Sequence, residues 1–248
     1  MNAKISLDDL WNSPSPEEPV FRSDSSPALP EGARRYLDHA IASDTRLASA
    51  VRLKMHGEIK LQRWLPFTAE EVIRWDRGMI WSAAVLKNGI PIRGSDRIVD
   101  GEGSMQWKLL GIFPVMTAAG PDITRSAIGR VQVESIWLPS VLCHPEVIWT
   151  ETDPSHPHAC FTMLGRAAEL DLAVEENGRV TTASLPRWGN PEGAAFHDVN
   201  FGGVLEAEGT FEGYTIPTRI RAGWYFGTDR FESDGEFFRA TVDQAIFR

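Results

Sequence analysis

Length, composition and charge place this chain among acidic, folded proteins of one or two domains. It has 248 residues, of which 42% are hydrophobic and 24% charged, and its formal net charge is −9. These proportions exclude wholesale disorder, and no run of basic residues is longer than Arg34-Arg35. We therefore expect no nucleic-acid partner, since nucleic-acid binding requires a basic patch. We also expect an anionic membrane surface to repel the protein.

Several features of the sequence predict the compartment in which the protein works. The residues from Met1 to Leu10 form no apolar leader. No stretch approaches the ~18 uninterrupted apolar residues of a membrane helix. The two cysteines, Cys143 and Cys160, are typical of small buried thiols in a reducing compartment. We expect a cytoplasmic protein without membrane insertion, and the sequence does not predict its oligomeric state.

The first segment of the chain is expected to lie outside the domain. Residues 1–28 contain four prolines among Ser, Glu and Asp. After a short amphipathic start, this composition favours neither a helix nor a strand. We therefore divide the chain into an extended Pro/Ser-rich arm, residues 1–28, and a ligand-binding domain with a curved sheet, residues 29–248.

A helix is predicted directly after the arm. The stretch 33–41 places Tyr36, Leu37, Ala40 and Ile41 on one apolar stripe at helical spacing. One face of this helix should therefore pack against the rest of the domain.

From residue 50 onward, the hydrophobic period changes to two, which is typical of half-buried strands. Asn-Gly turns at 88–89 and 177–178 separate such runs and indicate hairpins. Residues 66–71 are expected to form a turn between two strands. The predicted strands are 50–61, 74–86, 91–99, 104–110, 146–152, 159–164, 168–174, 179–185, 203–211, 215–226 and 236–246.

The segment 124–143 carries two periods at once. Ile128, Val131 and Leu138 follow a helical spacing, whereas Val131, Val133 and Trp137 follow a strand spacing. The β-branched residues favour a strand. The pattern alone leaves helix and strand open.

Several runs, taken in order, resemble an uncharacterised bacterial family related to half-barrel lipoprotein carriers and similar lipid-binding domains. These runs cover most of residues 29–248 and are LPEGARRYL (29–37), WLPFTA (64–69), MIWSA (79–83), DGEGSM (100–105), RVQVESIWLPSVL (130–142) and GYTIPT (213–218), followed by Trp224.

The resemblance implies a curved antiparallel sheet that wraps a helix over an apolar cavity, with residues 130–142 helical on its concave face. It supplies no settled catalytic residues. Because the sequence shows no signal peptide or lipobox, a lipoprotein-ferrying role is not carried over.

These observations predict an α+β fold in a single domain. We expect a strongly curved, mostly antiparallel sheet (a half-barrel) of about nine to eleven strands. An N-terminal helix and a short internal helix should lie over an apolar cavity.

Four residues are candidates for acid/base chemistry. On a helix, Arg130 and Glu134 are one turn apart and would form an ion pair. Inside a curved sheet, that pair would be partly buried, which perturbs the pKa of a carboxyl group. Asp96 stands in mid-strand, and His197 lies between two apolar segments. The competing interpretation of each residue is a structural ion pair or a solvated side chain.

The sequence contains nine tryptophans, which are many for one sheet. We expect about half of them in a packed core and the others along a ligand pocket. The candidate pocket residues are Trp64, Trp81, Trp107, Trp137, Trp149, Trp188 and Trp224.

No metal site and no cofactor are predicted. His156 and His158 lie in a Pro-rich turn without the spacing of a zinc motif. Two functional hypotheses remain. The first is a cytoplasmic pocket protein that binds a hydrophobic small molecule or an acyl chain. The second is a cofactor-independent isomerase, cyclase or hydrolase that acts on an apolar substrate, with Glu134 or Asp96 as acid/base and Arg130 as electrophile.

Overall fold

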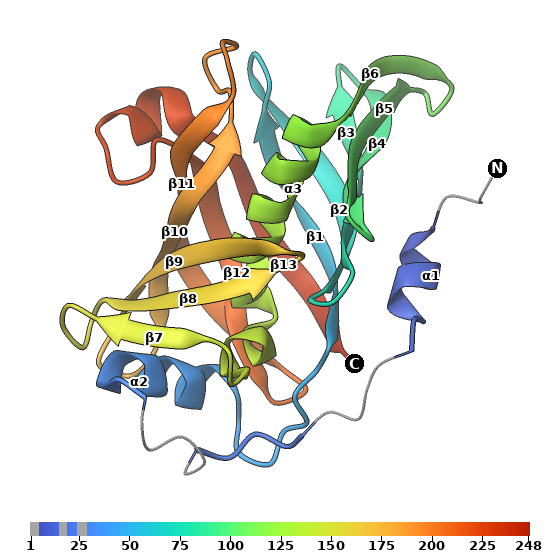
Figure 1. The fold of residues 1–248 in the computed structure, drawn as a ribbon. Coiled ribbons are helices and arrows are strands. Elements are labelled where there is room, and N and C mark those ends of the chain that lie inside the picture. The colour runs from blue at the N-terminus through green and yellow to red at the C-terminus, as the bar shows by residue number, and fades with distance from the viewer. Residues whose placement is uncertain (1–4, 15–18, 24–28) are drawn as a thin grey trace.

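The computed structural model describes residues 5–14, 19–23 and 29–248. One antiparallel sheet dominates the fold, and helices lie against it (Figure 1). The helical elements are α1 (Leu7–Trp11), α2 (Glu31–Ala40), α3 (Pro121–Val133), the 3₁₀ turns η2 (Glu134–Trp137) and η3 (Pro139–Cys143), and a π-helical turn η4 (Phe231–Gly235).

The sheet has 13 strands in the order β6-β5-β4-β3-β2-β1-β13-β12-β11-β10-β9-β8-β7. It therefore consists of two meanders, β1–β6 and β7–β13, which meet where β1 pairs with β13. Among the described strands, β6 and β7 do not pair, so the sheet is not closed. The strands are β1 (Ala50–Lys60), β2 (Trp64–Arg74), β3 (Gly78–Lys87), β4 (Ile90–Val99), β5 (Glu102–Leu109), β6 (Phe113–Ala119), β7 (Ile148–Glu151), β8 (Pro157–Met163), β9 (Arg166–Val174), β10 (Val180–Gly189), β11 (His197–Phe211), β12 (Tyr214–Trp224) and β13 (Glu236–Phe247).

The expected single domain with a large antiparallel sheet is confirmed, but two strands escaped prediction. The turn expected at residues 66–71 is wrong, because these residues lie inside β2 and pair with β1 throughout. Pro66 and the Glu70-Glu71 pair interrupt the alternation that marks a strand, and pairing on both sides overrides that local signal. The other missed strand is β6, a short edge strand.

The segment 124–143, which the pattern left open, is helical. It contains α3 followed by η2 and η3, in agreement with the helix that the resemblance implied for residues 130–142. Helix α3 contacts β3, β4 and β5 from one meander and β9 and β10 from the other. The sheet therefore curves around this helix (Figure 1).

Helix α2 has no side-chain cap of its own, because its N-cap residue is Pro30. The carboxylate of Glu151 in β7 accepts hydrogen bonds from the backbone N–H groups of Glu31 (3.3 Å) and Gly32 (2.8 Å) instead. A Cβ at Gly32 would lie 2.4 Å from the Pro154 carbonyl oxygen, so only glycine allows this close approach. The helix is therefore fixed to the end of the sheet at β7.

Residues 5–14 contact the outer face of the sheet, whereas residues 19–23 bond to the loop at residues 44–47. In α1, Leu10 is fully buried against Val72, Ile80 and Val99. The guanidinium group of Arg74 donates a 2.9 Å hydrogen bond to the carbonyl oxygen of Ser13. The boundary that separates an arm from the domain at residue 28 stays a prediction.

Candidate functional site

A pocket of about 380 Å³ lies between α3 and the concave face of the sheet. Its walls are mostly apolar, and seven aromatic side chains line it: Trp81, Trp137, Phe196, Phe201, Trp224, Phe237 and Phe238. All but Phe196, which precedes β11, come from β3, η2, β11, β12 and β13, so both meanders and the segment after α3 contribute. This size and lining fall within the range of small-molecule sites, roughly 300–1,000 Å³.

Contacts among the aromatic side chains fix their positions. The ring of Trp81 lies 6.1 Å from that of Phe238, and Phe201 meets Trp224 edge-on at 5.1 Å. The indole N–H of Trp137 donates a 2.9 Å hydrogen bond to the Pro217 carbonyl oxygen. Such packing makes a preformed wall rather than one assembled around a ligand.

A charged cluster on one side of the pocket centres on Arg130 of α3. Its Nε donates a 2.6 Å bond to Glu134, its Nη2 a 2.9 Å bond to Glu71, and its Nη1 lies 3.6 Å from Asp96. We call these four residues the Arg130 cluster. The structure thus brings together three of the residues singled out in the sequence and adds Glu71, which was missed.

Glu71 is the most deeply buried carboxyl group of the cluster, with no exposed surface. Burial raises its pKa well above the ordinary value, and the neighbouring carboxylate of Glu134 raises it further, while Arg130 opposes the shift. One buried oxygen of Glu71 and one of Glu134 lack a hydrogen-bond partner among the described residues. A proton on Glu71 supplies the missing donor between two adjacent acids.

Asp96 joins the cluster from β4. Burial raises the pKa of its carboxyl group, and this rise exceeds the opposing effects of Arg130 and of the hydrogen bond from Trp107. That hydrogen bond runs from the indole N–H to Oδ1 over 3.0 Å. Burial lowers the pKa of Arg130, but Glu134, Glu71 and Asp96 more than offset this effect. The guanidinium group therefore stays charged.

A second arginine, Arg187 of β10, also lines the pocket. Its Nε donates a 3.0 Å hydrogen bond to the Ser126 carbonyl oxygen, and its guanidinium carbon lies 4.5 Å and 5.0 Å from the ring centres of Phe201 and Trp224. Burial lowers its pKa to about 9, and repulsion from Arg130 adds to this, while attraction to Glu134 and Asp96 opposes it. No carboxylate in the described chain lies within ion-pair distance of it.

The seven candidate tryptophans divide into two groups. Trp81, Trp137 and Trp224 line the pocket. The other four lie elsewhere: Trp64 packs under Arg239, Trp107 binds Asp96, Trp149 donates to the Leu142 carbonyl oxygen, and Trp188 stacks on Arg125.

His197 does not join the pocket residues. Its side chain is about half exposed at the start of β11, and its ring lies 4.0 Å from Glu192. The His197 Nδ1 atom is 3.1 Å from the Ala195 carbonyl oxygen.

Two errors in the predicted elements explain why Glu71 and Arg187 were missed. Glu71 fell within the segment predicted as a turn, so no cross-strand partner was sought for it. Arg187 lies two residues beyond the end of the strand predicted at 179–185, although β10 continues to Gly189.

The described residues contain no group of three or more His, Cys, Asp or Glu side chains arranged to hold a metal ion. Within the same residues, none of the helices is both long enough and apolar enough to cross a membrane.

Comparison with known proteins gives one family match. A model described as a family of unknown function, DUF6920, matches residues 27–247. This confirms the resemblance to an uncharacterised family that the sequence suggested. No curated protein matches the chain.

Three solved structures are similar to this chain at low sequence identity. A LolA superfamily protein from Nitrosomonas europaea is 11% identical, with a TM-score of 0.40 over 88% of this chain and 92% of that one. A putative outer membrane lipoprotein-sorting protein domain from Vibrio parahaemolyticus is 6% identical, with a TM-score of 0.40 over 81% and 86%. A DUF1329 family protein from Desulfovibrio piger is 9% identical, with a TM-score of 0.38 over 87% and 91%.

Proposed function

The chain belongs to the DUF6920 family of unknown function, and we propose that it binds an amphipathic small molecule or acyl chain in the pocket beside α3. The observation that carries this proposal is the pocket itself. It has about 380 Å³ of space, a wall of fixed aromatic rings, and charged groups confined to a few positions. Transfer of a ligand's apolar chain from water into this pocket is favourable in free energy, and the charged groups determine which head group binds.

Arg187 specifies the head group. A buried guanidinium without a carboxylate partner costs solvation energy that an incoming anion recovers. Arg130 cannot play this part, because three carboxyl groups already surround it. The favoured ligand is therefore a molecule with an apolar chain and a carboxylate or similar anion.

Direct binding tests this proposal. Dodecanoate and dodecanol share their chain and differ in head group, so each is titrated into the protein while tryptophan fluorescence is recorded. We expect dodecanoate to bind at least tenfold more tightly than dodecanol, and Arg187→Gln to abolish that difference. The matched control is Arg93→Gln, which removes an exposed arginine outside the pocket. Absence of binding by either probe contradicts the proposal.

The natural ligand requires a separate measurement. Native mass spectrometry of protein purified from its own host, followed by organic extraction, identifies a ligand that co-purifies. The proposal expects an apolar molecule with an anionic head group. The expected cytoplasmic location stays a prediction, which fractionation of host cells tests.

One observation favours a second function, a cofactor-independent acid/base enzyme. Glu134 lines the pocket, and Arg130 donates a 2.6 Å hydrogen bond to its carboxylate. A substrate hydroxyl or acidic C–H group in the pocket would meet this carboxylate, with Arg130 beside it as electrophile. The reaction would be an isomerisation, a cyclisation or a hydrolysis.

Substitution of Glu134 distinguishes binding from catalysis. Each purified protein is incubated with the extracted ligand, and mass spectrometry follows its conversion. An enzyme converts the ligand and loses this activity in Glu134→Gln while ligand binding persists. A binding protein leaves the ligand unchanged in both forms.

A further inference from the structure

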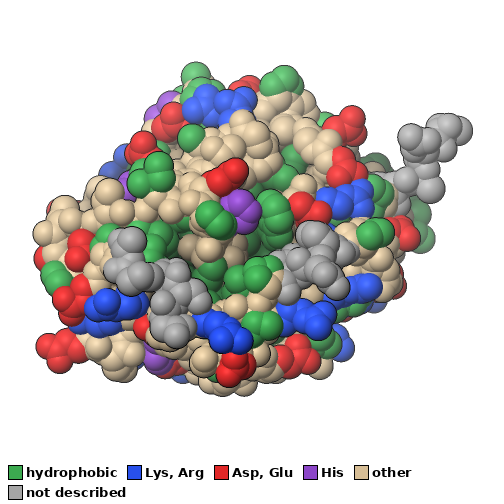
Figure 2. All heavy atoms as spheres, turned by 60° about the horizontal axis from the view of Figure 1, so that its bottom comes forward, with side chains coloured by type: hydrophobic (Ala, Val, Ile, Leu, Met, Phe, Trp, Pro, Cys, Tyr) green, Lys and Arg blue, Asp and Glu red, His purple; other side chains and the backbone are tan. Residues whose placement is uncertain are grey.

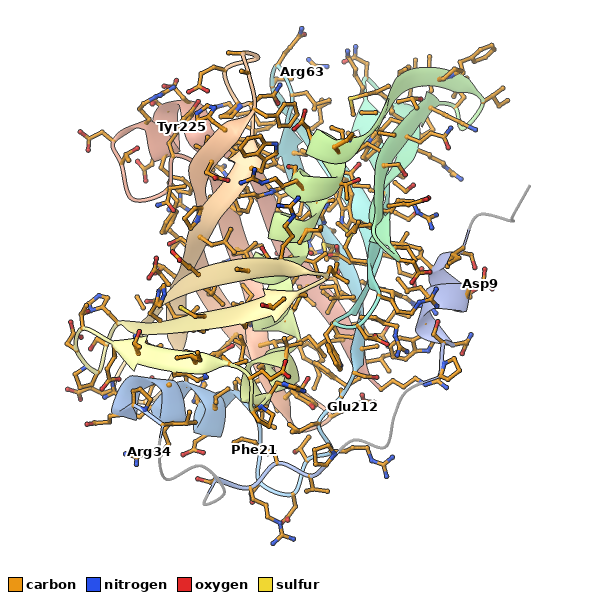
Figure 3. All side chains as sticks on the ribbon, viewed as in Figure 1. Asp9, Phe21, Arg34, Arg63, Glu212 and Tyr225 are labelled. Carbon is orange, nitrogen blue, oxygen red and sulfur yellow. The ribbon has the colours of Figure 1, made fainter. Side chains whose placement is uncertain are left out.

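Three hairpin turns lie at one end of the sheet. In an antiparallel meander, alternate turns share an end, so the β1–β2, β3–β4 and β5–β6 turns are neighbours (Figure 1). Arg63, labelled at the top of Figure 3, donates a hydrogen bond to Asn88 in the next turn. The backbone N–H of Leu110 donates a 3.0 Å bond to the Pro91 carbonyl oxygen. The turns therefore form one continuous surface.

This end gathers most of the exposed large hydrophobic side chains. Ten such side chains are found in the described residues, and eight of them lie here. They are Leu61, Leu86, Ile90 and five side chains of the β5–β6 hairpin between Leu110 and Met116, of which Ile112 is 70% and Phe113 61% exposed. We call residues 86–93 and 107–116 the hairpin patch. A contiguous apolar surface of this kind marks an interaction site.

The charge of the hairpin patch is opposite to that of the whole molecule. It contains Lys87, Arg93 and Lys108 and no acidic residue, whereas the chain carries a net charge of −9. None of these three basic side chains forms an ion pair with a described residue. By contrast, acidic and basic side chains lie intermingled on the face that includes the opposite end of the molecule (Figure 2).

The acidic part of this end lies beside the β1–β2 hairpin, where Lys60 donates a 3.3 Å hydrogen bond to the Ser233 carbonyl oxygen, and outside the hairpin patch. The loop that follows β12 begins at Tyr225, which Figure 3 labels on the other side of the same end. It carries Asp229, Glu232 and Asp234, together with Arg230. Surface charge therefore restricts an anionic partner to the hairpin patch.

The backbone of the patch is poorly suited to adding another protein strand. Edge strand β6 contains Pro114, which has no N–H group, and the β5–β6 ladder has an irregularity between Trp107 and Lys108. Both features discourage edge-to-edge pairing. A second copy seated on the patch would also bring its three basic side chains against those of the first. A partner therefore binds the hairpin patch through its side chains and not through backbone hydrogen bonds.

We propose that the hairpin patch docks on the surface of an anionic phospholipid membrane. Ile112 and Phe113 at the turn enter the boundary between head groups and acyl chains, while Lys87, Arg93 and Lys108 contact lipid phosphates. This revises the expectation that such a membrane repels the protein. That expectation used the net charge, but screening limits each surface charge to about 8 Å at physiological salt.

Docking brings the pocket towards the membrane. Ile59, near the end of β1, pairs with Phe238, near the start of β13, and both line the pocket close to the β1–β2 turn. An apolar molecule would thus travel a short way between the bilayer and the pocket. The docking proposal stands on the patch alone and does not require that the pocket binds a ligand.

Co-sedimentation with vesicles tests the proposal. The full chain is mixed with vesicles of phosphatidylglycerol and phosphatidylcholine, or of phosphatidylcholine alone, and the pelleted fraction is measured. We expect binding to the anionic vesicles that falls steeply with added salt. Lys87→Gln with Lys108→Gln should weaken it about twenty-fivefold, from about fivefold for each charge removed. Ile112→Ser with Phe113→Ser should weaken it at least tenfold. Extraction of lipid into the pocket leaves protein in the supernatant, so pelleting reports docking alone.

Two matched controls make the result specific. Ile148→Ser removes an equally exposed hydrophobic side chain on β7, and Lys54→Gln removes an exposed lysine on β1. Both should bind as the unaltered chain does, and circular dichroism confirms that every variant is folded. The proposal is overturned if anionic vesicles do not pellet the protein, or if the controls lose as much binding. It is also overturned if the patch substitutions instead abolish a dimer detected by analytical ultracentrifugation.

Discussion

The two sides of the pocket use arginine in opposite ways. The β1–β6 meander contributes Glu71 and Asp96, and these acids, with Glu134, surround Arg130. On the β7–β13 side, Arg187 meets a backbone carbonyl and two aromatic rings but no carboxylate. Arg130, with three acids at close range, holds elements of the fold together, whereas Arg187, which Glu134 and Asp96 attract only from beyond ion-pair distance, is available to a ligand. The number of acids around a buried cation thus separates a structural role from a binding role.

The largest effect should come from Arg130→Met. It leaves the buried acids of the Arg130 cluster without a counter-charge, and removal of one partner from a buried ion pair costs about 3–5 kcal/mol. Urea unfolding followed by tryptophan fluorescence measures the change in the free energy of unfolding. A loss below about 1 kcal/mol would show that the cluster is not structural.

Arg187→Met should give the reverse pattern. No described acid lies within ion-pair distance of this side chain, and the repulsion from Arg130 that its removal relieves is larger than its attraction to either Glu134 or Asp96. We expect the free energy of unfolding to change by less than about 1 kcal/mol, while dodecanoate affinity falls at least tenfold. Urea unfolding and fluorescence titration of the same preparation measure both quantities. A large stability loss with unchanged affinity would reverse the assignment of the two arginines.

Glu71→Gln tests the protonation state that the cluster requires. The pKa of Glu71 is raised in the folded protein above its ordinary value of 4.5. Folding therefore favours the protonated acid, and the unfolded chain ionises first as the pH rises. This contribution to stability is complete below about pH 4.5 and declines above it, by up to about 1.4 kcal/mol per pH unit, until the folded group also ionises.

The measurement is the free energy of unfolding from roughly pH 5 to pH 8 for the unaltered chain and for Glu71→Gln. The isosteric amide does not titrate, so the variant should decline less steeply with rising pH. Asp96 contributes a slope of the same sign in both proteins, because its pKa is also raised by burial. Parallel curves would mean that Glu71 is ionised in the folded state.

The smallest effect is expected from Trp224→Leu. The Trp224 ring lies 5.0 Å from the Arg187 guanidinium carbon, and a cation–π contact of this kind is worth about 0.5–1 kcal/mol. Loss of that contact lets Arg187 sample other positions, so dodecanoate affinity should fall about twofold to fivefold. Dodecanol affinity serves as the internal reference. An equal loss for both probes would indicate a change in the apolar wall instead.

Most of the fold could be predicted from local patterns, because alternation and turn residues are local signals. Eleven of the 13 strands overlap a predicted run. The failures have a physical cause. Pro66 and the Glu70-Glu71 pair lack the alternation of a strand, yet they lie in β2 because Pro66 is paired with β1 and the two glutamates are paired with both β1 and β3.

The candidate site was only partly visible in the sequence. The i, i+4 spacing revealed Arg130 and Glu134, since Arg130 lies in the last turn of α3 and Glu134 is its C-cap residue. Glu71 and Arg187 lie far away along the chain, and only sheet curvature brings Glu71 to Arg130 and Arg187 to the pocket, which no local pattern records. The tryptophans could not be sorted into core and pocket for the same reason. Their roles depend on which strands face α3.

The junction between β1 and β13 has a consequence for biosynthesis. Strand β1 emerges from the ribosome early and can pair with β2 at once. Its other neighbour, β13, ends at Phe247 and is translated almost two hundred residues later. At typical elongation rates of about 5–20 residues per second, the free edge of β1 waits roughly ten seconds or more for its partner. An unpaired strand edge is prone to aggregation during that time. Ribosome-bound chains that end before β13 should therefore recruit chaperones, and release of the complete strand should end that dependence.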